Sequence, residues 1–125
     1  MMSKDYDTFL KEKIIEIKIS LSNQCTDMYE LIGSVHDLFS SVYTTKLVAN
    51  KNVIEELWDV LLSVFLKSNF YGNRYDAIFA MNDIHLYAKK LKISLELDAI
   101  RKWRKSSNTS NSTEEILECV DDILT

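Results

Sequence analysis

Proline is missing from the 125 residues, and glycine occurs only twice, as Gly33 and Gly72. All-β folds depend on these two residues, because their tight turns require a positive φ or a preset one. The scarcity of both argues against a sheet protein and favours helices joined by polar turns. Phosphate-binding loops are excluded as well, since they need several glycines close together.

Cysteine and histidine are almost as scarce, with Cys25, Cys119, His36 and His85 as the complete set. The two cysteines form neither a C-x-x-C motif nor a disulfide framework, so we expect reduced, half-buried thiols. His36 adjoins Asp37, but consecutive helical residues point about 100° apart and make no dyad. No zinc or calcium motif is present, so we expect no metal, no cofactor and no enzymatic activity. A Cys–His nucleophile stays open only if the fold brings these side chains into one pocket.

Long hydrophobic runs are absent too. The first residues, MMSKDYDTFL, contain no apolar leader segment, and no window approaches the eighteen apolar residues that span a bilayer. We therefore expect a cytoplasmic protein with no membrane contact. The 46% hydrophobic and 27% charged content is that of an ordinary globular domain.

Apolar residues recur at spacings of three and four along most of the chain, which predicts amphipathic helices. These stripes lie in residues 4–21, 28–42, 53–65 and 77–91, around Ile100 and Trp103, and in 114–124. The third stripe covers so wide an arc that we expect a central helix packed on more than one side. The predicted fold is all-α: an antiparallel bundle of five to six helices in a single domain, 1–125, with a flexible polar loop at 106–113 before a C-terminal helix.

Local signals also predict where the helices begin and end. Asp27 with Glu30, and Asn52 with Glu55, have the spacing of capping pairs at the starts of the second and third helices. Gly72 is expected in the left-handed conformation that ends the third helix. Asn73 and Asp76 are then expected to open the fourth.

Charge is unevenly distributed, although the net charge is only −4. Residues 89–105 contain seven lysines and arginines. In a nucleic-acid-binding interpretation, the cations Arg101, Lys102, Arg104 and Lys105 would contact phosphates, and Trp103 would stack on a base. The acidic overall balance and the lack of an RNA- or DNA-binding motif weigh against that function. The simpler interpretation is that these cations pair with the acidic last helix.

Residues 106–125 contain five carboxylates and no lysine or arginine. A basic protein partner would meet these carboxylates, together with tyrosines that tolerate half-burial in interfaces. The predicted partner-binding residues are Glu114, Glu115, Glu118, Asp121, Asp122, Tyr71 and Tyr75. In size and charge the chain resembles the small immunity proteins that neutralise bacterial nuclease toxins, which implies an acidic inhibitor that covers a basic toxin surface. A nucleic-acid-associated regulator and a viral or phage helical adaptor are the alternatives.

Overall fold

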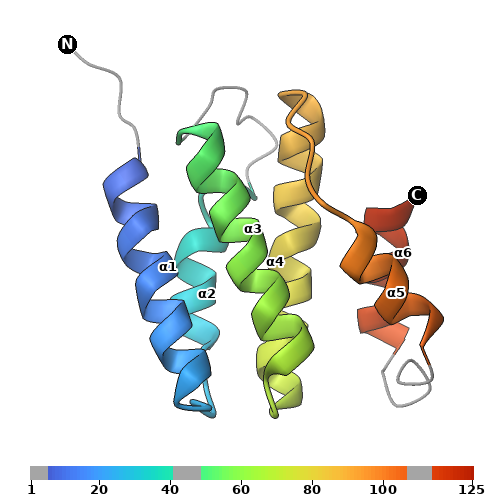
Figure 1. Ribbon diagram of the computed structural model, residues 1–125, viewed down its shortest axis with the longest axis horizontal. Helices are drawn as coiled ribbons and strands as arrows, with labels where there is room; N and C mark the ends of the chain where they lie inside the picture. The colour runs from blue at the N-terminus through green and yellow to red at the C-terminus, as the bar shows by residue number, and fades with distance from the viewer. Residues whose placement is uncertain (1–5, 41–48, 107–113) are drawn as a thin grey trace.

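The computed structural model describes residues 6–40, 49–106 and 114–125, and the described residues form six helices with no strand among them (Figure 1). The helices are α1 (Asp7–Ser22), α2 (Tyr29–His36), α3 (Lys51–Lys67), α4 (Tyr71–Lys90), α5 (Asp98–Lys105) and α6 (Glu114–Leu124). They pack against one another in one compact domain, and successive helices run in opposite directions. The predicted all-α bundle is confirmed.

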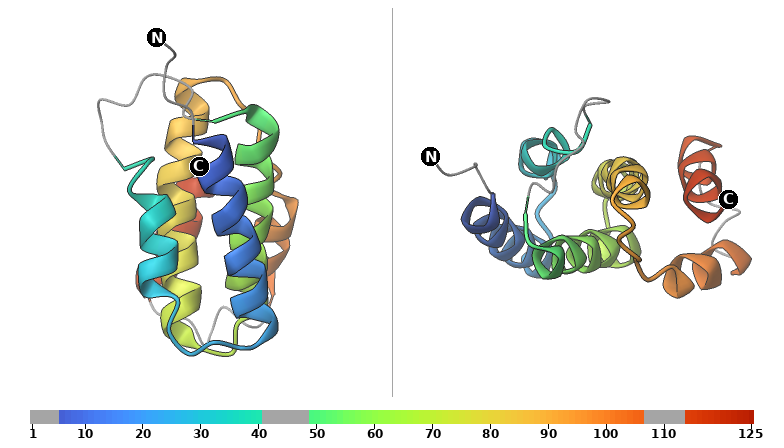
Figure 2. Two further views of the ribbon diagram at one scale, coloured as in Figure 1. Left: turned by 90° about the vertical axis from the view of Figure 1, so that its left-hand side faces the viewer. Right: turned by 90° about the horizontal axis from the view of Figure 1, so that it is seen from above.

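The helices form two layers, which are visible when the bundle is seen along the helix axes (Figure 2). Helices α1, α3 and α5 make one layer, and α2, α4 and α6 make the other. Each connection along the chain therefore crosses from one layer to the other. This arrangement places α2 and α6, which are far apart in sequence, on either side of α4.

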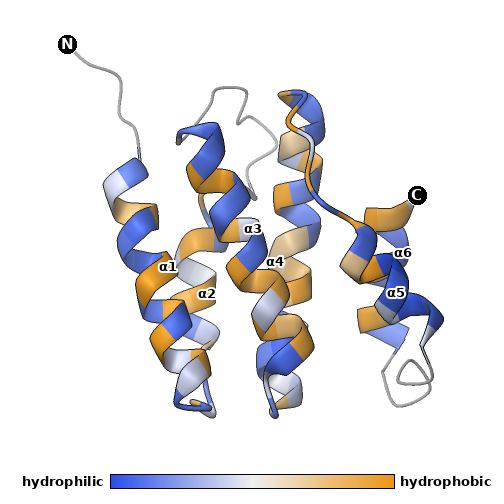
Figure 3. Ribbon diagram, viewed as in Figure 1, coloured by the Kyte–Doolittle hydropathy of each residue, from blue (hydrophilic) through white to orange (hydrophobic). Residues whose placement is uncertain are grey.

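Helices α3 and α4 occupy the centre of the bundle. Helix α3 contacts α1 and α4, and its eight buried side chains include Trp58 and Phe65. The expectation of a central third helix is thus confirmed. Helix α4 contacts α2, α3 and α6, and it contains more small and polar residues than α3 does, as the mixed colours of Figure 3 show. Trp58 also donates a hydrogen bond from Nε1 to the carbonyl of Glu96 at 2.9 Å, which fixes the segment between α4 and α5.

Two predictions about helix ends were wrong in the same place. Helix α3 ends at Lys67, and Gly72 lies in the first turn of α4 without a positive φ. The left-handed residues are instead Gln24 (φ 48°) and Lys92 (φ 59°), just after α1 and α4. Asn73 does not cap its own helix, because it lies inside the bundle with only 1% of its surface exposed.

The side chain of Asn73 instead holds the start of α2. Its Oδ1 accepts a hydrogen bond from the backbone N–H of Met28 at 2.9 Å, and its Nδ2 donates to the carbonyl of Cys25 at 2.7 Å. Nδ2 also lies 3.3 Å from Oγ of Ser68. One buried amide therefore fixes the α1–α2 connection, the end of α3 and the start of α4 together.

The other predicted ends were partly right. The N-cap of α2 is Met28, which makes no side-chain cap, but Asp27 just before it accepts a hydrogen bond at Oδ1 from the backbone N–H of Tyr29 at 3.0 Å. The cap of α3 is Asn50 rather than Asn52, since Asn50 Oδ1 accepts from the backbone N–H of Asn52 at 2.9 Å. Helix α2 ends at His36, earlier than the predicted stripe 28–42, because the chain turns there and buries Phe39 from a non-helical position. Residues 41 and 42 lie outside the described residues.

The C-terminal helix packs on its own bundle. Helix α6 buries Ile116, Cys119, Val120 and Ile123 against α4 and α5. Of the loop predicted at 106–113, only Ser106 falls within the described residues, so its flexibility is untested. Within the described ranges, no helix is both long enough and apolar enough to cross a membrane.

Candidate functional site

Three aromatic side chains form a ladder along the exposed side of α4. Tyr71, Tyr75 and Phe79 are spaced four residues apart, so they fall on one face of the helix. The Tyr71 and Tyr75 rings lie 6.3 Å apart at 15°, and the Tyr75 and Phe79 rings lie 5.9 Å apart at 23°. Tyr75 is half-buried, whereas Phe79 keeps 44% of its surface exposed. Such a row of exposed rings is an apolar surface that folding alone leaves uncovered.

Helix α6 borders one side of this aromatic ladder. Burial raises the pKa of the Tyr75 phenol, and Cys119 and Glu115 of α6 raise it further. All five carboxylates predicted as partner-binding residues on α6 are exposed, on the side opposite its buried residues. The fold therefore brings Tyr75, with Tyr71 stacked one turn before it, beside the acidic last helix, a proximity that could not be inferred from the sequence.

One of the five carboxylates has an intramolecular partner. Asp121 forms an ion pair with Arg104 of α5, with Nε–Oδ1 at 2.9 Å and Nη2–Oδ2 at 3.4 Å. The hydrogen bond from Arg104 lowers the pKa of Asp121 below its usual value. The interpretation that the cationic segment pairs with the acidic helix is confirmed for this arginine. Asp121 is accordingly the least suitable of the five for a contact with another protein.

The rest of the cationic segment is divided between the core and solvent. Trp103 is half-buried, and its ring lies 4.8 Å from that of Phe65, so part of its aromatic surface is already covered. Arg101 pairs with Asp98 at 3.0 Å, while Lys102 and Lys105 are exposed. The five residues considered for nucleic-acid contact thus do not form one continuous free surface.

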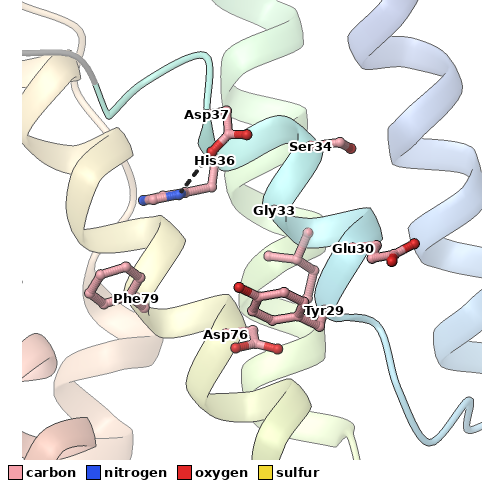
Figure 4. A pocket seen from close by; sticks show the side chains of 9 residues that line it. Tyr29, Glu30, Gly33, Ser34, His36, Asp37, Asp76 and Phe79 are labelled. Carbon is pink, nitrogen blue, oxygen red and sulfur yellow. Dashed lines mark ion pairs between the residues drawn. The ribbon is translucent and has the colours of Figure 1, made fainter.

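A hollow of about 530 Å³ lies on the other side of the aromatic ladder, between α2 and α4 (Figure 4). Its rim contains two exposed rings from different helices, Phe79 and Tyr29, the latter with 68% of its surface exposed. Glu30, Asp37 and Asp76 line the same hollow, and the side chain of Glu30 extends from it toward α1 (Figure 4). Burial raises the pKa of Asp76, with a further contribution from Asp27.

His36 forms one wall of this hollow. Its Nε2 lies 2.5 Å from Oδ2 of Asp83 on α4, and its ring lies 5.3 Å from that of Phe79. Asp37, the neighbour considered in the sequence, is 3.9 Å from Nδ1, and Figure 4 marks this ion pair. His36 and Asp83 are 47 positions apart, so no local motif could reveal their contact. Together they fasten α2 to α4.

Cys119 lies in surroundings that disfavour a nucleophilic role. Burial raises the pKa of the Cys119 thiol, and Asp122, Glu118 and Asp83 raise it further. Reactive thiolates need the opposite, an electropositive setting that lowers the thiol pKa. Cys25 and Cys119 are both free thiols, as predicted. Among the described residues, no group of three or more His, Cys, Asp or Glu side chains is arranged to hold a metal ion.

The two layers differ in charge. Helices α2, α4 and α6 together contain eight carboxylates and three lysines or arginines. Helices α1, α3 and α5 contain seven carboxylates and nine lysines or arginines. We call the exposed sides of α2, α4 and α6 the acidic face. It combines the aromatic ladder with carboxylates on both flanking helices.

No protein-family model, curated protein or solved structure matches this chain. The acidic face is therefore interpreted from its own chemistry. Five residues of this region were not predicted as partner-binding residues from the sequence: Tyr29, His36, Asp76, Phe79 and Asp83. The spacing of Tyr71, Tyr75 and Phe79 was the one available signal, because residues four apart share a helix face.

Proposed function

We propose that this protein is a small protein-binding module of the immunity or antitoxin type, which acts in the cytoplasm on a basic, nuclease-type toxin. It covers the active or substrate-binding surface of that toxin and performs no chemistry of its own. The observation that carries the proposal is the aromatic ladder Tyr71–Tyr75–Phe79 on α4, flanked by exposed carboxylates on α2 and α6. A surface of this composition suits a cationic protein better than it suits a polyanion.

The mechanism follows from complementary charge and shape. A nuclease binds phosphates through lysines and arginines, and the acidic face offers carboxylates to the same cations. Carboxylates accelerate encounter and select the partner, while the stacked rings supply apolar contact area at a low cost in conformational entropy. An inhibitor that occupies the substrate surface blocks RNA or DNA by competition.

The test compares two variants with matched charge. The face variant carries Glu115→Gln, Glu118→Gln and Asp122→Asn, and it leaves Asp121 in its pair with Arg104. The control variant changes three exposed carboxylates of the other layer: Glu12→Gln, Glu16→Gln and Glu56→Gln. Both variants lose three negative charges, and the control also loses the surface Lys13–Glu16 and Lys18–Glu56 pairs, which contribute little to stability. A loss of binding in the face variant alone therefore reports the place of the charges and not their number.

Tagged wild type and both variants are used to capture proteins from the native host, with low-salt and then high-salt washes. We expect one stoichiometric protein that survives high salt and is lost with the face variant only. Three exposed ion pairs at about 0.5 kcal/mol each correspond to roughly a tenfold loss of affinity. The captured protein is then assayed for cleavage of RNA and DNA, and a stoichiometric amount of wild type is expected to inhibit it. Capture of nucleic acid alone, lost at high salt from all three proteins, would instead support a regulator that uses residues 89–105.

A further inference from the structure

We propose that the hollow between α2 and α4 receives an arginine side chain of the bound protein. This inference rests on the proposed function and names the group that the acidic face recognises. The hollow has the two features that a guanidinium group requires: aromatic rings to stack on and carboxylates to accept its hydrogen bonds. Both come from helices that the fold brings together, α2 and α4.

The aromatic side is formed by Tyr29 and Phe79. Tyr29 keeps 68% of its surface exposed and Phe79 keeps 44%, and the two rings border the hollow from two different helices (Figure 4). A planar guanidinium stacks on such rings and keeps its edge free for hydrogen bonds, whereas the ammonium group of lysine is a compact point charge without a plane. The shape and the aromatic rim therefore favour arginine over lysine.

The polar side is formed by Asp37 and Asp76, because the side chain of Glu30 extends toward α1 (Figure 4). The residues that line the hollow include no lysine or arginine. Asp76 is partly dehydrated and lies near Asp27, which is why its pKa is raised. A cation bound at Asp76 would offset both effects. Arginine can engage two carboxylate oxygens at once and also carries the positive charge that offsets them, which a neutral side chain lacks.

The hollow stays open because one of its lining residues is a glycine. A Cβ atom placed on Gly33 would meet no other atom within 4 Å, and Gly33 has no positive φ. A larger side chain at this position would therefore extend into the hollow without straining the backbone. The contact between His36 and Asp83 holds the adjoining wall in place.

Gly33 provides a variant that blocks the hollow without unfolding the protein. Gly33→Leu is expected to fill the space and, because glycine is a poor helix former, to raise the melting temperature. Gly33→Ala gives the same gain in helix propensity and leaves most of the hollow open. If Gly33→Leu loses binding and Gly33→Ala does not, the loss is due to the filled hollow and not to the change in stability that both variants share.

The probes are N-acetyl-arginine methylamide, its lysine counterpart and its neutral citrulline counterpart, each titrated into the full ¹⁵N-labelled chain. We expect saturable shifts of the Tyr29, Gly33 and Phe79 amides with arginine, at least threefold weaker binding of lysine and no saturable binding of citrulline. Gly33→Leu should abolish arginine binding, and Asp76→Asn should weaken it at least threefold. Asp59→Asn is the matched control, because burial also raises the pKa of Asp59 but this residue lies in the other layer.

Two results would overturn the inference: no saturable shift at these amides with arginine, or unchanged arginine binding by Gly33→Leu. The host partner distinguishes this inference from the proposed function. If the α6 face variant loses the partner while Gly33→Leu and Asp76→Asn retain it, the arginine assignment is wrong and the proposed function stands. If arginine binds in the hollow but no host protein is captured, the proposed function fails and the binding site stands.

Discussion

Replacing Asn73 with leucine is expected to destabilise the protein more than any exposed substitution. The side chain is 1% exposed and joins three segments, through Met28, Cys25 and Ser68. Leucine has the same branched arrangement of heavy atoms but a larger volume, so the variant leaves no cavity; the lost hydrogen bonds set the minimum effect, to which crowding adds. The backbone N–H of Met28 lies in the core and would have no partner in the variant.

The expected magnitude follows from these bonds. An unpaired buried polar group costs about 1–3 kcal/mol, and the partly buried carbonyl of Cys25 adds a smaller amount, since water reaches it. The loss in the free energy of unfolding is therefore about 2–4 kcal/mol, against a typical total of about 5–15 kcal/mol for a domain.

Urea unfolding followed by far-UV circular dichroism measures this loss, and amide exchange locates it. Exchange should accelerate first at Met28 and in the first turn of α2. Asn82→Leu is the control, because Asn82 is a partly exposed asparagine of the same helix. A loss below about 0.5 kcal/mol for Asn73→Leu, or equal losses for both variants, would refute the assigned role of Asn73.

Three further predictions concern single side chains. Burial, and secondarily Lys89, lowers the pKa of His85 below its ordinary value of 6.5, so the unfolded chain binds a proton more readily than the folded one. The free energy of unfolding should therefore be highest above pH 6.5 and decrease as the pH falls below it. Urea unfolding at several pH values measures this slope, which His85→Leu should remove. Cys25 should react with a thiol reagent faster than Cys119, because Cys119 is buried and its thiol pKa is raised; equal rates, followed by mass spectrometry, would contradict this. Trp58→Phe should lower the free energy of unfolding by about 2–3 kcal/mol in urea unfolding, because it removes the Nε1 hydrogen bond and leaves a cavity beside the smaller buried ring; a loss near zero would contradict this.

Helix positions were largely predictable from the sequence, because each helix buries a stripe that its own residues specify. The stripe of α3 is the best example, since its buried side chains include Trp58 and Phe65 as the spacing requires. Asn73 shows where local patterns fail. It follows Gly72 and resembles a cap, but its partners Met28 and Cys25 are more than forty positions away.

The candidate site was predictable only in part. Tyr71 and Tyr75 were identified from their residue type, and the carboxylates of α6 from their number. Their proximity depends on the order of helices in the second layer, which local periodicity does not determine. The contact of His36 with Asp83 and the hollow beside it arise from the same packing. Sequence patterns thus indicate which side chains are exposed, while the fold determines which of them meet.

Calorimetric titration of the purified host partner against wild type, the face variant and the control variant decides whether the acidic face is the binding surface. We expect the face variant to bind roughly tenfold more weakly and the control variant to stay within about twofold of wild type. Equal affinities for all three proteins, or a loss confined to the control variant, would show that the acidic face is not where the partner binds.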